Sequence, residues 1–304
     1  MNRTPMSNDL PPISLIICSY NRPQLLEESV HSVLAGSVLP HELFIMDQSE
    51  VAHPGLSRLT HPGCSIRYTQ TLVRGECPAR NQALRLAQYE LLAFTDDDVL
   101  VQPDWLETLA RNLVAAGPMA VVTGRVLPEK QQAGGFAPST ITDTEPAIYQ
   151  GRINRDVLFP MNMAFWRSAL DAVGLFDERL GAGSPFHGAE DNDFGFRLLE
   201  AGYQIHYVPT ATVVHRAWRP LRDYARLHWY YGYGQGAYYA KYLNLRDSYM
   251  ARRMARSLVG NTKRSISLLR RNQREAQASV AYALGIVAGA THWLIWQRSE
   301  RSHA

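Results

Sequence analysis

The sequence is poor in several features that would each point to a particular class of protein. It has three cysteines in 304 residues, Cys18, Cys64 and Cys77, without the paired spacing of a metal site. An odd, small number of thiols favours a reducing compartment. The formal net charge of +3 is too small to indicate a nucleic-acid-binding protein. Residues 1–12 are polar and lack the apolar stretch of a secretory signal, so we expect a cytoplasmic protein.

Motifs of several large enzyme classes are absent as well. No Gly-x-Gly-x-x-Gly follows the first apolar run, which argues against a dinucleotide-dependent dehydrogenase. The chain has neither the Gly-x-x-x-x-Gly-Lys-Ser/Thr of P-loop enzymes nor the Gly-x-Ser-x-Gly elbow of many hydrolases. The loop after the first apolar run, residues 19–23, reads Ser-Tyr-Asn-Arg-Pro and is not glycine-rich, which sets sugar nucleotidylyltransferases aside.

What is present is an alternation of short apolar runs with amphipathic stretches through residues 13–125. Short apolar runs are typical of strands buried on both faces of a parallel sheet. Strands that alternate with helices form βαβ units. We therefore expect an α/β fold with a mostly parallel central sheet flanked by helices. The expected strands are 13–18, 43–46, 65–68 and 91–95, and the expected helices are 22–35 and 76–88.

The second half of the chain is less regular. Residues 128–158 carry Gly134, Gly135 and scattered prolines, and we expect a mobile loop that closes over the site. From Leu221 onward the chain becomes helical in pattern and rich in aromatic residues and arginine. We divide it into a polar tail (1–12), an α/β domain (13–218) and a helical extension (219–304). Two short strands are expected at 204–207 and 212–215, around Pro209.

The run Phe94-Thr95-Asp96-Asp97-Asp98 is the most informative stretch of the sequence. It places three carboxylates that repel one another at the end of an expected buried strand. Mg²⁺ or Mn²⁺ would compensate them, because these cations take oxygen ligands and bridge carboxylates to substrate phosphates. Ligands of open parallel sheets also bind at the carboxyl ends of strands. We therefore predict a metal–phosphate site; the alternative is an acidic loop capping the helix expected near Asp104.

Other polar residues follow other expected elements. Ser19 and Asn21 follow the first strand, and Asp47 follows the second. Parallel strands end at one edge of a sheet, so these residues and the triple aspartate are expected to share a site. A fourth group, Glu190-Asp191-Asn192-Asp193, leads into a predicted helix.

These segments resemble the inverting glycosyltransferases of family 2, which have the GT-A fold. Each segment alone is weakly specific, but their order between residues 13 and 216 is specific. The sequence looks most like bacterial sugar transferases that build surface polysaccharides. The matching segments are Leu15–Arg22, Ala79-Arg80-Asn81, Thr95–Asp98, Pro103–Leu106, Gly174–Glu178, Glu190-Asp191 with Asp193, Arg197-Leu198, Gly202, Pro209 and His215.

The resemblance implies transfer of a sugar from a nucleotide diphosphate-sugar donor to a hydroxyl of a glycan or lipid-linked glycan. Asp98 is similar to the metal-binding member of the family's Asp-x-Asp motif. His215 matches a histidine that completes the metal site in several relatives, and an imidazole ligand favours Mn²⁺ over Mg²⁺. A histidine that bonds backbone at a strand end is the alternative. Residues implied to bind the donor nucleotide are Ser19, Asn21, Asp47, Arg80, Asp96 and Asp97, with Arg74 as a further candidate for the diphosphate.

Inversion requires a general base that deprotonates the acceptor hydroxyl. By similarity to the family's Glu-Asp pair we expect Asp191 to be this base, with Glu190 and Asp193 as competitors. The alternative is that these acids stabilise the positive N-terminus of the following helix, and we favour it for Asp193. A non-catalytic nucleotide-sugar-binding or assembly subunit on the same fold is the rival function, since it would need no base.

The last third of the chain combines rings, basic residues and an apolar segment. Eight aromatic rings within residues 224–242 are expected to fasten the helical extension to the α/β domain, with an acceptor subsite as the alternative. Nine Lys or Arg residues and one acid lie between residues 246 and 274. Residues 278–296 follow without Asp, Glu, Lys or Arg, and Gly285 and Gly289 have the spacing of paired helices. We expect attachment to an anionic membrane surface, at the inner face of the cell membrane. Packing in a soluble core or a homodimer interface, and a single span, are the alternatives.

Overall fold

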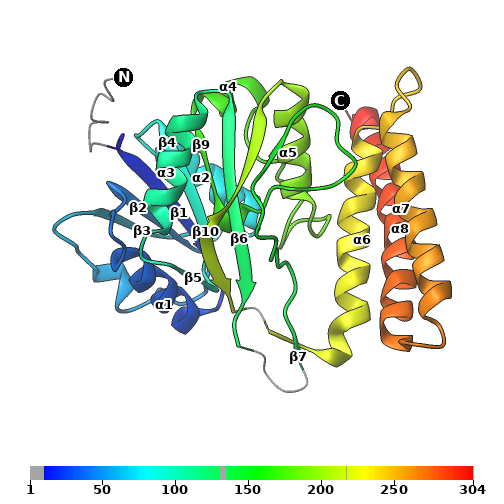
Figure 1. Cartoon of the computed structure of the whole chain (residues 1–304), viewed down its shortest axis with the longest axis horizontal. Helices are drawn as coiled ribbons and strands as arrows, with labels where there is room; N and C mark the ends of the chain where they lie inside the picture. The colour runs from blue at the N-terminus through cyan, green and yellow to red at the C-terminus, as the bar shows by residue number, and fades with distance from the viewer. Residues whose placement is uncertain (1–9, 131–134, 217, 304) are drawn as a thin grey trace.

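The computed structural model describes residues 10–130, 135–216 and 218–303, so most of the predicted polar tail lies outside the described residues. A central sheet is covered by helices on both faces, and three long helices stack beside it (Figure 1). The helices are α1 (Pro23–Leu34), α2 (Glu76–Leu86), α3 (Trp105–Ala116), α4 (Ser168–Val173), α5 (Glu190–Glu200), α6 (Tyr224–Lys241), α7 (Tyr249–Leu268) and α8 (Gln273–His303). The strands are β1 (Ile13–Ser19), β2 (Glu42–Asp47), β3 (Ser65–Gln70), β4 (Leu91–Asp96), β5 (Val99–Val101), β6 (Ala120–Pro128), β7 (Gly135–Phe136), β8 (Ala147–Tyr149), β9 (Met163–Trp166), β10 (Gln204–His215) and β11 (Arg219–Pro220).

The N-terminal half of the sheet is parallel, as predicted. Its strands lie in the order β3-β2-β1-β4, and β1 pairs in parallel with both β2 and β4. All seven residues of β1 are buried because helices cover both faces of the sheet. This pairing places Ser19 beside Asp47, and Cys18 beside Asp96, so the predicted meeting of these strand ends at one edge is confirmed.

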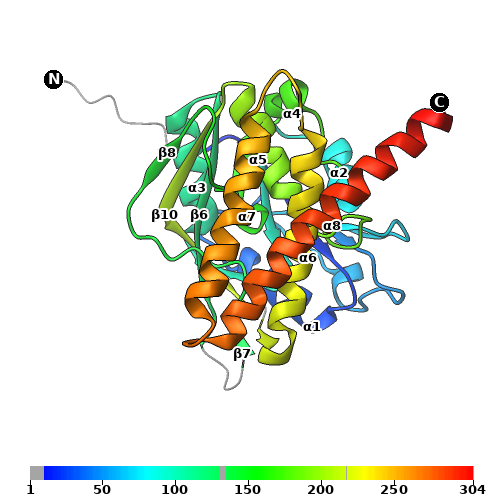
Figure 2. The same cartoon turned by 90° about the vertical axis from the view of Figure 1, so that its right-hand side faces the viewer.

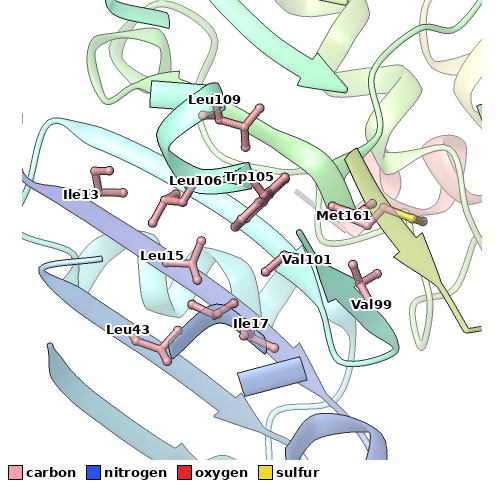
Figure 3. Packing of buried hydrophobic residues seen from close by; sticks show 14 of the residues in the cluster. Ile13, Leu15, Ile17, Leu43, Val99, Val101, Trp105, Leu106, Leu109 and Met161 are labelled. Carbon is pink, nitrogen blue, oxygen red and sulfur yellow. The ribbon is translucent and has the colours of Figure 1, made fainter. Parts of the chain in front are cut away.

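Alternate residues of β1 enter two separate hydrophobic layers, because side chains of a strand point alternately to opposite faces. Ile13, Leu15 and Ile17 pack beneath α1 and α3, where Trp105 is almost completely buried (Figure 3). Ile16 and Cys18 face the other layer, which contains residues from α2, α4 and α5. The two layers fix the strand ends, and with them the polar residues that follow.

The C-terminal half of the sheet is mixed, which the sequence pattern did not predict. β9 lies between β4 and β6 and is antiparallel to both, whereas β10 is parallel to β6. The two short strands expected around Pro209 are wrong as stated. They form one strand, β10, whose register with β6 shifts between Val208 and Thr212. The expected loop at 128–158 contains β7 and β8, and β8 pairs with β10; residues 131–134 lie outside the described residues.

The three C-terminal helices pack against the α/β part through aromatic rings. Phe196 of α5 makes edge contacts with Tyr238 of α6 and with Tyr242, the residue after α6, with ring centroids 6.0 and 4.7 Å apart, and Tyr238 is fully buried. The expectation that the rings of α6 fasten this region to the α/β part is therefore confirmed for these tyrosines. The division of the chain at residue 218 stays a prediction.

Helices α6 and α8 meet along a seam of four glycines, Gly232 and Gly236 of α6 and Gly285 and Gly289 of α8. A β-carbon at any of these positions would overlap a backbone oxygen of the facing helix. The predicted pairing of Gly285 and Gly289 is thus realised inside the chain. Among the described residues, one helix, Gln273–Glu300, is long and apolar enough to cross a membrane, and 39% of its most apolar window is buried. Length and composition of this kind are also found in core helices of soluble proteins.

Candidate functional site

The triple aspartate lies at the carboxyl end of β4 and in the turn to β5, beside residues from two other segments. Asp97 and Asp98 are almost completely buried. Arg22, just before α1, donates through Nη1 to Oδ1 of Asp97 at 3.0 Å and to Oδ2 of Asp98 at 2.7 Å. The hydroxyl of Ser19 donates to Oδ2 of Asp97 at 2.7 Å. The acids therefore belong to a charged group at the sheet edge. They do not cap α3, whose N-terminal residue Asp104 makes no side-chain capping hydrogen bond.

Asp97 and Asp98 differ in their ionisation. Burial raises the pKa of Asp97 to about 6, although Arg22 counteracts this effect. Burial also opposes the ionisation of Asp98, but its hydrogen bond with His215 and the charges of His215 and Arg22 hold its pKa below the ordinary value. Asp98 is therefore the carboxylate of the pair that stays negative over the physiological range.

His215 lies at the end of β10, which brings it beside Asp98. Its Nε2 is 3.4 Å from Oδ1 of Asp98, and its Nδ1 is 3.1 Å from the carbonyl oxygen of Pro138. A carbonyl oxygen can only accept, so Nδ1 carries a proton and Nε2 points to the carboxylate. This arrangement resembles metal-binding histidines, whose second nitrogen donates to a fixed acceptor.

The pair fits a divalent cation as a partial coordination shell. Nε2 of His215 and Oδ1 of Asp98 are 3.4 Å apart, so one cation could take both atoms as ligands. No group of three His, Cys, Asp or Glu side chains suited to a metal occurs among the described residues. A cation held here would therefore take its remaining ligands from water and substrate phosphates, which is common for Mg²⁺ sites.

A second charged group surrounds the buried guanidinium of Arg80 in α2. Its Nη2 contacts Glu76 and donates to Oδ1 of Asp96 at 2.9 Å, while its Nη1 is 4.0 Å from Oε1 of Glu190. Among the described residues, Arg80 Nη1 and Glu190 Oε2 are buried without a hydrogen-bond partner. Burial raises the pKa of Glu76 to about 8 despite the neighbouring arginine. The guanidinium of Arg80 thus links the end of β4 to the start of α5.

The predicted nucleotide-side acid Asp47 is buried at the end of β2. It accepts hydrogen bonds from the hydroxyl of Tyr68 at 2.5 Å and from the backbone N–H of Ser49 at 2.9 Å. Asn21 is exposed in the left-handed region at φ +54°, and its N–H donates to Oγ of Ser49 at 2.8 Å. These contacts join the ends of β1 and β2. Arg74 lies outside this group and contacts Tyr20 and Glu50.

The Glu190-Asp191 pair occupies the first turn of α5. The helix begins after Ala189, whose φ of +66° turns the chain sharply into it. Asp191 accepts a hydrogen bond from the N–H of Asn192 at 2.8 Å. Burial, and then the charge of Asp156, raise the pKa of Asp191 to about 7. Burial, and then the charge of Asp191, raise the pKa of Glu190 to about 7. Two acids with such values are suited to proton transfer near neutral pH.

Asp193 has a different environment from its neighbours in sequence. It lies in the first turn of α5, but its carboxylate is fully buried and makes ion pairs with Arg197 and Lys241. The expectation that Asp193 mainly stabilises the helix N-terminus is therefore incomplete, because these side chains are its partners. Because Asp193 is already paired with two basic side chains, it is a weaker candidate for the base than Asp191.

Three residues of these groups were assigned no role from the sequence: Arg22, Glu76 and Tyr68. Arg22 was part of the first matching segment. Three adjacent aspartates need a positive counter-charge, and this need could have predicted the role of Arg22. Glu76 stands four residues before Arg80, a spacing at which helical side chains meet. Tyr68 gave no signal, because its contact with Asp47 depends on the pairing of β2 with β3.

The comparisons with known proteins agree on one family. The family described as "Glycosyl transferase family 2" matches residues 14–174, more than half of the chain. A pre-mycofactocin glycosyltransferase of Mycobacterium tuberculosis is 29% identical over 205 residues, a match that covers 65% of this chain and 39% of that protein. The succinoglycan biosynthesis protein ExoM of Rhizobium meliloti is 29% identical over 221 residues, which is 68% of each chain. The chain thus spans well under half the length of its mycobacterial relative.

Solved structures share the fold. The mannosyltransferase PcManGT of Pyrobaculum calidifontis, solved in complex with GDP-Man and Mn²⁺, superposes with a TM-score of 0.62 at 18% identity. That match covers 92% of this chain and 88% of the other. TarS of S. aureus, residues 1–349, gives a TM-score of 0.54 at 13% identity, with 92% of both chains covered. The expected GT-A fold is confirmed, and the chain belongs to glycosyl transferase family 2.

Proposed function

We propose that the protein transfers a sugar, with inversion, from a nucleotide diphosphate-sugar to a hydroxyl group of a glycan or lipid-linked glycan. The observation that carries this proposal is the chain of contacts at the sheet edge. The Asp98–His215 pair lies two residues beyond Asp96, the carboxylate of Asp96 accepts from Arg80, and Arg80 is 4.0 Å from Glu190, the neighbour of Asp191. The guanidinium of Arg80 thus links the proposed donor-side group to the helix that carries the proposed base.

The donor would lie across the ends of β1, β2 and β4. Asp47, Ser19 and Asn21 would contact the nucleoside, and Asp96 the ribose, with Arg80 holding Asp96 in place. Asp98 and His215 would hold Mg²⁺ or Mn²⁺, and such a cation, when bound, supplies positive charge against the oxygens of the leaving diphosphate. To bind the cation, Asp98 would be ionised and His215 neutral at Nε2, so the cation would take the place of the proton that can lie between these two side chains.

Asp191 would act as the general base. Its carboxylate takes the proton of the acceptor hydroxyl while the hydroxyl oxygen forms a bond to the anomeric carbon. The bond from that carbon to the diphosphate breaks on the opposite face, and the diphosphate leaves with the electron pair. A pKa of about 7 lets the base be ionised at neutral pH and still hold the proton well. Glu190, next to it, is the competing assignment.

A pocket of about 260 Å³ beside Asp156 suits the acceptor. Asp156 lines this pocket, and its charge raises the pKa of Asp191. Asp191 itself lines a small adjoining cavity that also includes Asp156. Tyr149, Phe159 and Tyr207 also line it, and aromatic faces stack on sugar C–H groups. An acceptor bound here would contact both polar and aromatic side chains.

The experiment is a donor screen on the full chain with UDP-, dTDP- and GDP-sugars, in Mn²⁺ or EDTA, that follows release of nucleoside diphosphate. We expect metal-dependent release from one donor, about 10²–10⁴-fold slower in Asp191→Asn. Asp191→Asn should bind the donor as the wild type does, and Asp171→Asn, which removes an exposed acid of α4, should be fully active.

The rival function is a non-catalytic nucleotide-sugar-binding or assembly subunit. Donor binding without turnover, unchanged by Asp191→Asn across a range of glycan acceptors, would favour that rival. Thermal shift in the same plates measures the binding. Absence of both binding and release for every donor would contradict the glycosyltransferase proposal.

A further inference from the structure

The outer face of α8 carries a stripe of exposed apolar side chains. Val280, Leu284, Val287 and Leu294 are each between 42% and 56% exposed, and Ile295 is 60% exposed. Their spacing of three, four and seven residues places them on one side of the helix. The other side of α8 carries Gly285 and Gly289 and is closed against α6. The stripe therefore points away from the rest of the protein.

The neighbouring helix α7 presents a stripe of mixed character. Val259 and Ile266 are 52% and 71% exposed, and they alternate with exposed basic residues at the same helical spacing. The exposed basic residues of this stripe are Arg252, Arg256 and Lys263, and Arg270 follows the end of the helix; Arg256 donates to Asn154. Helix α7 packs against α8, and Figure 2 shows both helices on the same face of the molecule. The two stripes together form the α7–α8 face.

The charge on this face is strongly one-sided. Of the nine Lys or Arg residues between 246 and 274, Arg253 is buried against Asp156 and Arg264 pairs with Glu275. The stripe of α7 itself contains exposed basic residues and no acid. Helices that lie in a bilayer interface combine an apolar stripe with flanking Lys and Arg side chains. Each basic residue near an anionic membrane surface is attracted to it. The α7–α8 face has both properties.

Charge and packing favour a bilayer surface over other occupants. A second copy of the chain would bring two positive faces together, and like charges oppose such an interface. A transmembrane span would require α8 to leave α6, because the glycine seam holds its other side. We propose that the α7–α8 face docks on the surface of an anionic lipid bilayer, with the apolar stripe of α8 inserted and the basic residues of α7 at the headgroups.

This inference concerns a surface separated from the site by α6, and it does not rest on the proposed catalytic function. If both hold, the site faces acceptors carried on lipid at the same membrane.

The test is co-sedimentation of the full chain with vesicles. Vesicles of phosphatidylcholine with 40% phosphatidylglycerol are compared with pure phosphatidylcholine, at about 0.05 and 0.5 M salt. We expect at least tenfold stronger partitioning to the anionic vesicles at low salt, and loss of most of it at high salt, because salt screens the headgroup charge. Equal partitioning to both vesicles, or none to either, would overturn the proposal without any variant.

Two double variants separate the contributions. Leu284→Ser with Val287→Ser removes exposed apolar surface, and Arg252→Gln with Lys263→Gln removes exposed charge. Each should weaken binding at least tenfold at an unchanged thermal midpoint. Val51→Ser with Leu72→Ser, two residues that are 80% and 86% exposed outside this face, should bind as the wild type does. Unaltered binding of either test variant would refute the assigned face. A concentration-dependent dimer lost in the Leu284→Ser, Val287→Ser variant, with no vesicle binding, would assign the face to a second copy instead.

Discussion

The hydroxyl of Tyr242, at the end of α6, donates a 2.7 Å hydrogen bond to Oδ1 of Asp193 in the first turn of α5. The same carboxylate bonds Lys241 and accepts from Nε of Arg197 at 2.9 Å. These three donors surround a side chain with no exposed surface. Asp193 therefore ties the C-terminal helices to the helix that carries the candidate base.

Replacement of Asp193 by Ala should destabilise the fold. It removes the acidic partner of Arg197 and one of the two acids that pair with Lys241, which keeps Asp177; breaking a buried pair of this kind typically costs about 3–5 kcal/mol. Urea denaturation measures the loss in the free energy of unfolding. Asp191→Asn is the matched control two residues away, and it should be neutral or stabilising, since burial already disfavours the charge of Asp191. Equal losses in both variants would contradict the separate roles of the two acids.

The protein should lose stability as the pH rises from 5 to 8. Folding raises the pKa of four carboxyls into this interval: Asp97 to about 6, Glu190 and Asp191 to about 7, and Glu76 to about 8. Burial raises the pKa of Asp156 as well. In the unfolded chain they titrate near pH 4, so the folded state binds more protons between pH 4 and 8. The stability they contribute is present at low pH and is lost as the pH passes through the folded values.

Calorimetry in EDTA at a series of pH values measures this loss as a fall in the thermal midpoint of unfolding. Glu76→Gln removes one of the four titrating carboxyls and should flatten the curve. A midpoint that is constant or rises over this interval would show that the carboxyls are not protonated in the folded protein.

Turnover should depend on pH in the opposite direction. Asp191 must be ionised to accept a proton, so kcat/KM should rise as the pH passes about 7, with a midpoint that belongs to the Glu190–Asp191 pair. Asp156→Asn removes a negative charge that raises the pKa of Asp191 and should move the midpoint to lower pH. Asp143→Asn, in the wall of the same pocket, should leave it in place. A midpoint that does not respond to Asp156→Asn would argue against Asp191 as the titrating base.

His215→Gln should weaken the binding of Mn²⁺ and so raise the Mn²⁺ concentration that turnover requires. Loss of the imidazole leaves Asp98 as the single protein ligand, and we expect at least about a tenfold rise in the Mn²⁺ concentration for half-maximal turnover. Electron paramagnetic resonance of Mn²⁺ with nucleoside diphosphate measures binding without turnover. His206→Gln lies on the same strand, away from Asp98, and serves as the control. An unchanged Mn²⁺ requirement in His215→Gln would favour the alternative that this histidine only bonds the backbone.

Gly289→Ala should destabilise the α6–α8 pair. A methyl group there would overlap the carbonyl of Tyr233, and two packed backbones can separate only by moving a whole helix. Overpacking of this kind costs about 1–3 kcal/mol. Gly260→Ala in α7 has open space around it and should be stabilising by about 0.5–1 kcal/mol. A neutral Gly289→Ala, measured by urea denaturation, would mean that the helices are not in backbone contact.

The sequence was most informative for the parallel half of the sheet. Runs such as Ile13–Cys18 are apolar throughout, and such runs are specific for strands covered on both faces. β9 was not foreseen, because its four residues form a strand only by filling the space between β4 and β6. The register shift in β10 likewise depends on its pairing with β6, and Pro209 alone suggested a break between two strands.

Within the site, the polar residues at strand ends were predictable, and their partners were not. The group around Asp98 follows from strand order, since β1 and β4 are neighbours. The link from Asp96 through Arg80 to Glu190 joins segments about a hundred residues apart, and no local pattern encodes it. The roles assigned to these residues remain predictions.

The glycine seam gives the C-terminal region a mechanical property. Because α6 and α8 are in backbone contact at the four glycines, a shift of one helix there cannot be accommodated by a change of side-chain rotamers. Rotation of one about its axis would drive side chains into the carbonyls of the other. A displacement of α8 is therefore passed to α6 as movement of a whole helix, and it reaches α5 at the junction of Tyr242 with Asp193.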